Sequence, residues 1–331
     1  MKAIRLHEHG GPEVLRLDDV AVPAIGPGEV LVRVHAVGIN PPDGYVRDGM
    51  TILPPELRPT FSLPIVPGTD VSGVVVALAP DVERFTVGDE VFGMLRFPRA
   101  EGAAYAEFVA APAHDLARKP AALDHVHAAG APMALLTAWQ HLVDPGHDGG
   151  SPFQAHPHRP VPLGAGSRVL VNGAGGGVGH LAVQVAKWKG AHVVAAASAR
   201  HESFLAELGA DEFLDYAVQP PEEVVRDVDL VLDTVGGPRT GRFLRSVKRG
   251  GALFPVFFGP CDADLAAELG VTVSGTQVRS SGTQLAEIAP LLQDGTIRIA
   301  VESTFPLAHA AQAHERAAQG HLQGKLVLTI G

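Results

Sequence analysis

The sequence predicts an α/β protein with two parts, a β-rich part and a doubly wound parallel sheet. Short segments in the first 125 residues alternate apolar and polar side chains, as half-buried strands do. From about residue 126 onward, strand-like and helix-like segments alternate, which is typical of a parallel sheet covered by helices. A glycine-rich turn, residues 173–179, joins one of these strands to one of these helices.

The β-rich part starts at the N-terminus. Residues 30–37 and 71–78 alternate clearly between apolar and polar side chains, and residues 105–110 do so more weakly. Turns rich in proline and glycine separate these segments, among them PPDG at residues 41–44. Short strands joined by such turns predict a small barrel or sandwich.

The second part begins with an alanine- and leucine-rich helix. The predicted helices cover residues 128–142, 180–189, 202–208 and, near the C-terminus, 284–292. The predicted strands cover residues 168–172, 192–197, 229–233, 252–257 and, in the tail, 325–329. Proline, glycine and histidine dominate residues 144–166, which are therefore predicted to form a loop.

Composition limits the classes of partner. The formal net charge of −10 repels nucleic acids and anionic lipid, so neither nucleic acid nor a membrane is an expected partner. A single cysteine, Cys261, excludes an intrachain disulfide and a multi-thiolate zinc site. The N-terminus lacks the apolar core of a signal peptide, and no run approaches the length of a membrane span, so we expect a cytoplasmic protein.

The glycine-rich turn predicts a dinucleotide site. Ala174, Gly176 and Gly179 occupy the positions of a G-x-G-x-x-G fingerprint, with alanine in the first position. Small residues permit the tight turn, the middle glycine lets backbone approach a pyrophosphate, and the last lets the helix pack on the strand. Amide groups at the helix N-terminus would then bind the anion. The residues expected to bind the dinucleotide here are Ala174, Gly176, Gly177, Val178 and Gly179.

The end of the next strand indicates which dinucleotide binds. Sites for NAD usually have an acidic residue there that bonds the ribose 2′-hydroxyl. This chain has Ser198 and Arg200 in that region, and no carboxylate before Glu202. A serine hydroxyl and a guanidinium suit a 2′-phosphate, so the sequence predicts NADPH.

Several segments in order follow one pattern: the N-terminal MKAIRLHEHGGPEVL, GINPPDGYVRDG, VPGTDVSGVV, VGDEVFG, PMALLTAW, the glycine-rich turn, and the tail ending in GKLVLTI. This pattern resembles the medium-chain dehydrogenase/reductase superfamily, specifically its zinc-independent quinone oxidoreductase-like branch. The resemblance implies a GroES-like β-rich catalytic domain of residues 1–125 and 265–331. It implies a Rossmann NADP-binding domain, with its doubly wound parallel sheet, of residues 126–264.

The chain departs from the zinc alcohol dehydrogenases of that superfamily where they bind metal. Asn40 stands where they have a cysteine, and Gly68, Thr69 and Asp70 stand where they have Gly-His-Glu. Their four-cysteine structural zinc loop has no counterpart, because Cys261 is the only thiol. Without thiolate or imidazole at those positions, we expect no metal cofactor.

The same resemblance implies roles for individual residues. Asn40 and Tyr45 would line the pocket beside the nicotinamide and are the expected catalytic residues. From the residues alone, Tyr45 could instead fill the core and Asn40 could cap a turn. The further cofactor-binding residues that the resemblance implies are Thr137, near the nicotinamide ribose, Tyr216, near the 2′-phosphate, and Val235, Phe257, Phe258 and Gly259, in loops under the cofactor.

We therefore expect an NADPH-dependent oxidoreductase that passes hydride to a quinone or an α,β-unsaturated carbonyl compound. The charge on the carbonyl oxygen would be stabilised by the Tyr45 hydroxyl, the Asn40 amide or water. Two alternatives stay open: an enoyl-thioester reductase, and a non-catalytic NADPH-binding sensor or structural protein.

Two features lie outside this pattern of motifs. His141, His147, His156 and His158 are close in sequence, and we expect them to lie in a solvated surface loop that binds no metal. Residues 271–275 (VTVSG) would form the last strand of the parallel sheet. They contain no proline or lysine to blunt an edge strand, so we expect a homodimer paired through this edge.

Overall fold

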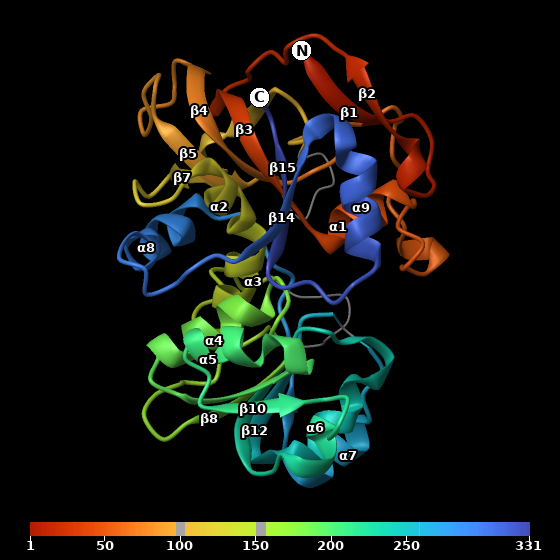
Figure 1. Ribbon diagram of the computed structural model, residues 1–331, viewed down its shortest axis with the longest axis vertical. Helices are drawn as coiled ribbons and strands as arrows, with labels where there is room; N and C mark the ends of the chain where they lie inside the picture. The colour runs from red at the N-terminus through yellow and green to blue at the C-terminus, as the bar shows by residue number, and fades with distance from the viewer. Residues whose placement is uncertain (97–102, 150–156, 258) are drawn as a thin grey trace. The chain divides into compact units, whose positions relative to one another are not determined.

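The computed structural model describes residues 1–96, 103–149, 157–257 and 259–331. They form two compact units, coloured along the chain in Figure 1. Unit 1 contains Met1–Leu136, Arg279–Gly295 and Ile299–Gly331, and unit 2 contains Thr137–Val278 and Thr296–Arg298. The first division falls later in the chain than the expected boundary after residue 125, because helix α2 (His125–Gly130) packs against strands of unit 1.

Unit 1 is organised by a seven-stranded sheet with the order β14-β15-β3-β4-β5-β7, in which β6 also pairs with β3. The long strand β3 pairs antiparallel with β15, so the red-orange and blue ends of the chain lie side by side (Figure 1). A separate antiparallel pair joins β1 to β2. The strands are β1 (Lys2–Leu6), β2 (Leu15–Asp19), β3 (Glu29–Ile39), β4 (Asp70–Leu78), β5 (Glu90–Met94), β6 (Phe108–Pro112), β7 (Leu116–Arg118), β14 (Val301–Pro306) and β15 (Lys325–Thr329).

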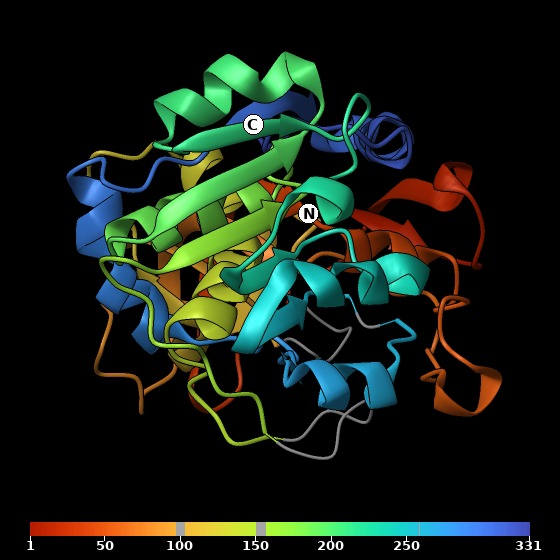
Figure 2. The same cartoon turned by 90° about the horizontal axis from the view of Figure 1, so that it is seen from below.

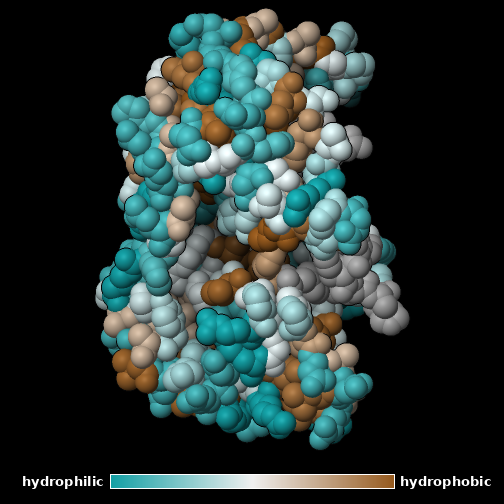
Figure 3. Space-filling view, turned by 90° about the vertical axis from the view of Figure 1, so that its right-hand side faces the viewer, coloured by the Kyte–Doolittle hydropathy of each residue, from teal (hydrophilic) through white to brown (hydrophobic). Residues whose placement is uncertain are grey.

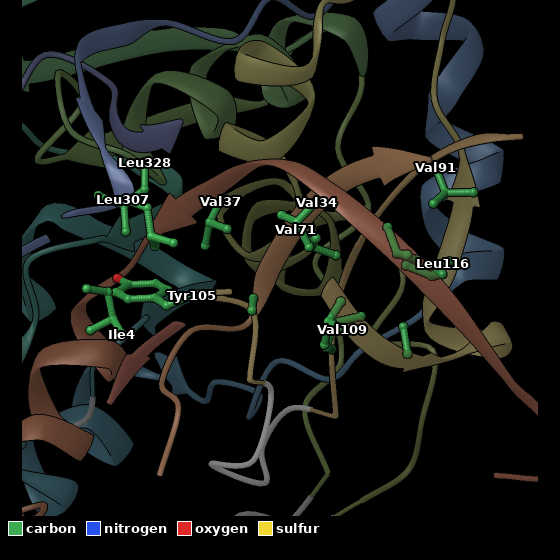
Figure 4. Packing of buried hydrophobic residues seen from close by; sticks show 14 of the residues in the cluster. Ile4, Val34, Val37, Val71, Val91, Tyr105, Val109, Leu116, Leu307 and Leu328 are labelled. Carbon is green, nitrogen blue, oxygen red and sulfur yellow. The ribbon is translucent and has the colours of Figure 1, made fainter. Parts of the chain in front are cut away.

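Alternation of side chains along these strands builds the core of unit 1. Val30, Val32 and Val34 of β3 are fully or almost fully buried, whereas the intervening Arg33 is exposed. Figure 4 shows part of this core, which combines side chains from β3 and β4 with Leu328 of β15. The helices of this unit are α1 (Pro41–Arg47), α2, the start of α3 (Pro132–Leu142), α8 (Gly282–Gln293) and α9 (Ala310–Ala318).

Two local predictions in this region were wrong. Residues 41–44 form the first turn of helix α1 and not a loop, because Asn40 and Asp43 make a capping box and a proline occupies the first helical position. The single helix predicted over 128–142 is two helices, α2 and α3. A proline begins the second, where its missing N–H and fixed φ fit the first turn and would disrupt a helix interior.

Unit 2 is organised by a six-stranded sheet with the order β10-β9-β8-β11-β12-β13, and every neighbouring pair is parallel. Figure 2 shows these strands side by side, from green to cyan. The strands are β8 (Arg168–Asn172), β9 (His192–Ala197), β10 (Glu212–Asp215), β11 (Val228–Asp233), β12 (Val247–Pro255) and β13 (Thr272–Val273). The helices are the remainder of α3, α4 (Gly179–Trp188), α5 (Glu202–Glu207), α6 (Pro221–Val224) and α7 (Ala263–Leu269). The predicted doubly wound parallel sheet is confirmed.

The two tryptophans of the chain lie together in unit 2. Trp139 of α3 is buried and Trp188 of α4 is partly exposed, and their rings stack with centroids 5.3 Å apart. The stack joins helix α3 to helix α4, which begins at the glycine-rich turn. Offset stacking of this kind contributes about 1 kcal/mol beyond the area that it buries.

The face of the molecule drawn in Figure 3 is mostly hydrophilic. Hydrophilic residues cover most of the face in Figure 3, and hydrophobic residues lie between them singly or in small groups. Scattered apolar side chains of this kind are normal on globular proteins. Among the described residues, no helix combines the length and the apolar character needed to cross a membrane.

Candidate cofactor and substrate sites

The turn after β8 requires glycine at two positions. Gly173 has a φ of +76°, which residues with a side chain rarely adopt. A Cβ added to Gly179 would lie 2.1 Å from the carbonyl oxygen of Gly173, so α4 can start this close to β8 only with glycine there. At Gly176, a Cβ would meet nothing nearer than 3.4 Å. The folded chain therefore has room for a side chain at Gly176, and a glycine there leaves that space free for a ligand.

The ends of β9 and β10 bring three of the predicted residues into one region of unit 2. Ser198 follows β9 directly and Tyr216 follows β10 directly, and the backbone N–H of Tyr216 donates to the carbonyl of Ala197 (3.2 Å). Arg200 is exposed, and its Nε lies 3.1 Å from Nε2 of the buried His201. This contact anchors an exposed guanidinium through its Nε.

His201 is a residue that the sequence reasoning missed. Its ring lies against the glycine-rich turn, since a Cβ added to Gly175 would come within 2.7 Å of the ring carbons. The imidazole thus connects Arg200 to the turn after β8. No periodic pattern marks it, because its importance depends on the contact with Gly175.

Asp233, at the end of β11, shapes the next loop and was also missed. Its carboxylate accepts hydrogen bonds from the backbone N–H groups of Val235 (3.2 Å) and Gly236 (2.9 Å) and from the side chain of Asn172 (2.8 Å). Asp233 and Asn172 are register partners in the parallel pair β11–β8. The sequence did contain a signal for this contact, because Asn172 and Asp233 are polar residues that each end an apolar strand. The carboxylate thus holds the backbone of Val235, whose side chain is exposed.

The loop after β12 contacts the backbone of the loop that contains Val235. The N–H of Gly237 donates to the carbonyl of Phe257 (3.0 Å), and a Cβ on Gly259 would lie 1.8 Å from the carbonyl of Gly237. Phe257 is partly exposed, and Phe258 lies outside the described residues. The structure therefore brings the Val235 loop and the Phe257 loop together.

These loops share one edge of the sheet. They leave the carboxyl ends of the parallel strands, and the sheet order reverses direction between β8 and β11. Ligands of open α/β sheets bind at the carboxyl edge, at such a switch point. Thr137, the remaining cofactor residue expected in this unit, is almost fully buried in α3, and its carbonyl accepts from Nδ1 of His141 (2.8 Å).

The expected solvated histidine loop is wrong for two of its members. His141 belongs to helix α3 and His158 packs beside it, and both side chains are buried. His158 bonds to Ser274 Oγ and to the carbonyl of His141, each at 3.0 Å. Burial lowers the pKa of His141 to about 4, so both ring systems are neutral packing groups near pH 7. His156 lies outside the described residues, and the described ones contain no group of three potential metal ligands.

In unit 1, Asn40 and Tyr45 lie on the same short helix. Asn40 is the N-cap of α1 and is buried, while Tyr45 is partly buried one turn further along. Burial, together with the nearby Asp48, raises the pKa of the Tyr45 hydroxyl above its usual value. The hydroxyl therefore carries its proton at neutral pH and is able to donate a hydrogen bond.

The residues that replace the zinc ligands do not suit Zn²⁺. The side-chain oxygen of Asn40 accepts a hydrogen bond from the ammonium of Lys325, and its nitrogen donates to Asp70 (3.0 Å). Thr69 offers a neutral hydroxyl. A positive charge in contact with the one amide oxygen available would repel Zn²⁺, which prefers thiolate and imidazole.

Comparison with known proteins agrees with this arrangement. Residues 26–121 match the alcohol dehydrogenase GroES-like domain, and residues 208–328 match the family described as zinc-binding dehydrogenase. The chain is 34% identical to the mitochondrial NAD(P)H oxidoreductase RTN4IP1 of Mus musculus, over 100% of this chain and 89% of that protein. It is 31% identical to the chloroplastic NADPH-dependent alkenal/one oxidoreductase of Arabidopsis thaliana, over 99% of this chain and 79% of that protein.

A solved structure supports the same assignment. The quinone oxidoreductase from Coxiella burnetii is 31% identical and superposes with a TM-score of 0.86, covering 100% of this chain and 99% of that one. Sequence identity at this level extends over the whole chain, and the fold is also shared. Together they identify the family as well as the fold. The chain belongs to the quinone oxidoreductases of the medium-chain dehydrogenase/reductase superfamily.

Proposed function

We propose that this protein is an NADPH-dependent reductase of quinones and α,β-unsaturated carbonyl compounds that works without zinc. The observation that carries the proposal is the carboxyl edge of the unit 2 sheet. A glycine-rich turn with free space at Gly176 stands beside a strand end that has Ser198 and Arg200 and no carboxylate. This combination suits a dinucleotide that bears a 2′-phosphate.

The residues present fit this cofactor. The turn and the N-terminus of α4 would hold the pyrophosphate, Ser198, Arg200 and Tyr216 the 2′-phosphate, and the loops at Val235 and Phe257 the nicotinamide half. Bound NADPH would supply a hydride from C4 of its nicotinamide ring. Relatives described as an alkenal/one oxidoreductase and a quinone oxidoreductase support this choice of acceptors.

The protein's own contribution in unit 1 would be a hydrogen bond to the substrate. As hydride reaches the β-carbon of an enone, or a quinone, negative charge develops on the carbonyl oxygen. The hydroxyl of Tyr45, which keeps its proton at neutral pH, would be the donor on α1. Solvent would then supply the proton that completes the product.

The test is a rate measurement with purified protein. Oxidation of NADPH and of NADH would be followed with quinones, enones and enoyl thioesters, before and after dialysis against a chelator. We expect turnover of quinones or enones, preference for NADPH, and no effect of the chelator. Turnover of thioesters alone would move the protein to the enoyl-thioester reductases. Loss of activity that zinc restores would refute the zinc-free mechanism.

We also propose that the protein is a homodimer paired through β13. This strand ends the sheet of unit 2, and within the described chain it pairs with β12 alone. Edge strands carry unpaired backbone groups that are usually covered or paired. A two-fold copy of the same strand would extend the sheet.

A further inference from the structure

A buried ammonium lies at the start of strand β15. Lys325 begins β15 and is 4% exposed. Its Nζ donates to the carbonyl of Ile39 (2.9 Å) and to the side-chain oxygen of Asn40. None of the ion pairs formed by the described residues includes Lys325. An ammonium removed from water is strongly destabilising unless its surroundings compensate it, so this residue requires an explanation.

Asn40 connects that ammonium to Asp70 through hydrogen bonds of its side-chain amide. Because its oxygen accepts from Lys325, its nitrogen must point the other way, where it donates to Asp70 Oδ2 (3.0 Å) and more weakly to the carbonyl of Gly38 (3.4 Å). Asp70 is fully buried, and it also accepts from the backbone N–H of Met133 (3.0 Å), in the first turn of α3. The amide of Asn40 is thus fully engaged inside the protein.

A second carboxylate fixes helix α1 to the same group. Asp43 accepts from the backbone N–H of Asn40 (2.8 Å) and from the hydroxyl of Tyr105 (3.2 Å). Figure 4 shows Tyr105 among hydrophobic side chains that include Ile4 and Leu328. We call Asn40, Asp43, Asp70 and Lys325 the Lys325 cluster. It connects β15, the end of β3, α1, β4 and α3.

The charges around the cluster are few. Burial raises the pKa of Asp70 to about 7 and that of Asp43 to about 6, and the Lys325 ammonium opposes both shifts. Burial lowers the pKa of Lys325, and the two carboxylates oppose that shift. Beyond Tyr105 stand His314, whose Nε2 lies 3.0 Å from the Tyr105 hydroxyl, and Arg47, which contacts the other His314 nitrogen (2.9 Å). His314 is neutral near pH 7, because burial lowers its pKa to about 4.

We propose that Lys325 is a positioning residue for the reaction: its ammonium orients the Asn40 amide, balances the buried carboxylates and thereby holds α1, which carries Tyr45. Metal-dependent members of the superfamily have metal ligands in this region. Here the Lys325 ammonium occupies it. The kinetic consequence rests on the proposed function, whereas the effect on α1 does not.

The first test needs no substrate. Lys325→Met keeps the length of the side chain and removes the charge. The matched control is Lys119→Met, because the side chain of Lys119 in unit 1 is also 4% exposed, but its ammonium pairs with Glu90 (3.3 Å) and donates to the carbonyls of Pro120 and Leu123. Amide hydrogen exchange of residues 40–47 should speed up at least about ten-fold in Lys325→Met and stay unchanged in Lys119→Met. Unchanged exchange in Lys325→Met, or equal acceleration in both variants, would overturn the proposal.

The second test separates charge from hydrogen bonding. Lys325→Gln keeps a donor toward Asn40 without the charge, and it also serves if the methionine variant does not fold. Loss of the cation raises the pKa of Asp70, so Asp70 becomes protonated at a higher pH. Protonation of Asp70 removes the charged acceptor of the Asn40 amide, and this should lower kcat/KM. The acid limb of the kcat/KM profile should therefore move up by about one pH unit, with the KM for NADPH unchanged.

The outcomes of the two tests are distinct. An acid limb that does not move in Lys325→Gln contradicts the role of the charge. If the wild-type protein reduces neither quinones nor enones, the proposed function fails, and the exchange measurement still decides whether Lys325 holds α1.

Discussion

Arg200 is the side chain on which the proposed preference for NADPH depends. Its guanidinium is exposed beside the end of β9 and is anchored through Nε to His201. Replacing Arg200 with alanine should raise the KM for NADPH about ten-fold, a loss of ~1.4 kcal/mol, and leave the KM for NADH nearly unchanged. Steady-state kinetics with both cofactors would measure this difference.

Arg249→Ala is the matched control for Arg200→Ala. Arg249 is also an exposed arginine of unit 2, but its guanidinium donates to the carbonyl of Glu268 in the neighbourhood of α7. The Arg249→Ala variant should have the same KM for NADPH and for NADH as the wild type. Equal affinity of the wild-type protein for NADPH and NADH would contradict the assignment of the 2′-phosphate site.

His141 makes the protein sensitive to acid. Its pKa is about 4 in the folded chain, against about 6.5 when exposed, so the unfolded state binds the proton more readily. The stability that the neutral ring contributes is present above pH 6.5 and is lost as the pH falls toward 4. Between about pH 6.5 and 5, His141→Gln should lose about 2 kcal/mol less stability than the wild type, measured by urea unfolding at each pH.

The control for that measurement is His309→Gln, at an exposed histidine. Its pH dependence should follow the wild type. Asp70 acts in the opposite direction, because its raised pKa makes the folded state bind the proton more readily, and its contribution falls as the pH rises from about 4 to 7. Only the difference between the variant and the wild type therefore isolates His141, and parallel curves would contradict its assignment.

The sequence alone predicted the residues whose role depends on their neighbours in the sequence. The glycines of the turn and the missing carboxylate after β9 are visible in a few consecutive letters. Lys325 and Asp233 are not, because each matters through a partner far away along the chain, Asn40 and Asn172 respectively. The Asn40 amide was one of three donors expected for the substrate, beside Tyr45 and water; in the structure that amide bonds to Lys325 and Asp70, contacts that the sequence does not show.

The start of α4 allows backbone packing and cofactor binding to be separated. Gly179→Ala places a Cβ 2.1 Å from the Gly173 carbonyl, so α4 must move away from β8 and the protein should lose a few kcal/mol of stability. Gly176→Ala meets nothing nearer than 3.4 Å, so it should fold normally and bind NADPH at least about ten-fold more weakly. Thermal unfolding and fluorescence titration with NADPH would measure the two effects.

Gly164→Ala is the control for both substitutions, since a Cβ there would have nothing within 4 Å. It should change neither stability nor NADPH affinity. If Gly176→Ala binds NADPH as tightly as the wild type, the pyrophosphate does not pass over the turn.

Five of the six strands of unit 2 overlap predicted strands, because each contains a short apolar run between loops, whereas the four-residue strand β10 (EFLD) was missed. The other errors fell where one residue decides the outcome. PPDG reads as a turn, yet Asp43 at the third helical position makes it the beginning of α1. The buried histidines were placed in solvent because composition alone does not show that His141 is on a buried face of its predicted helix or that Ser274 provides a partner for His158.

The proposed homodimer depends on the edge of the unit 2 sheet. Thr272 is exposed in β13, and the N–H of Ser274 donates inward to Leu253 (3.2 Å). We expect a homodimer of about twice the 34.5 kDa chain mass by light scattering at micromolar concentration. Thr272→Lys should shift the mass toward a single chain, because a charge on an edge strand opposes pairing.

Val218→Lys adds the same charge at a highly exposed valine of the same unit and should leave the mass unchanged. A single-chain mass for the wild-type protein would contradict pairing through β13. So would a dimer that Thr272→Lys does not affect.

The stacked tryptophans give the protein an uneven optical response. Trp139 and Trp188 are the only indoles, and both belong to unit 2. Emission excited at the red edge of protein absorption, and the near-ultraviolet circular dichroism of the coupled rings, therefore come from that unit alone. Unit 1 carries Tyr45 and Tyr105 but no indole, so it could melt without changing the indole signal. An apparently simple unfolding curve recorded from these rings describes half of the protein, and a backbone signal is needed to detect the other half.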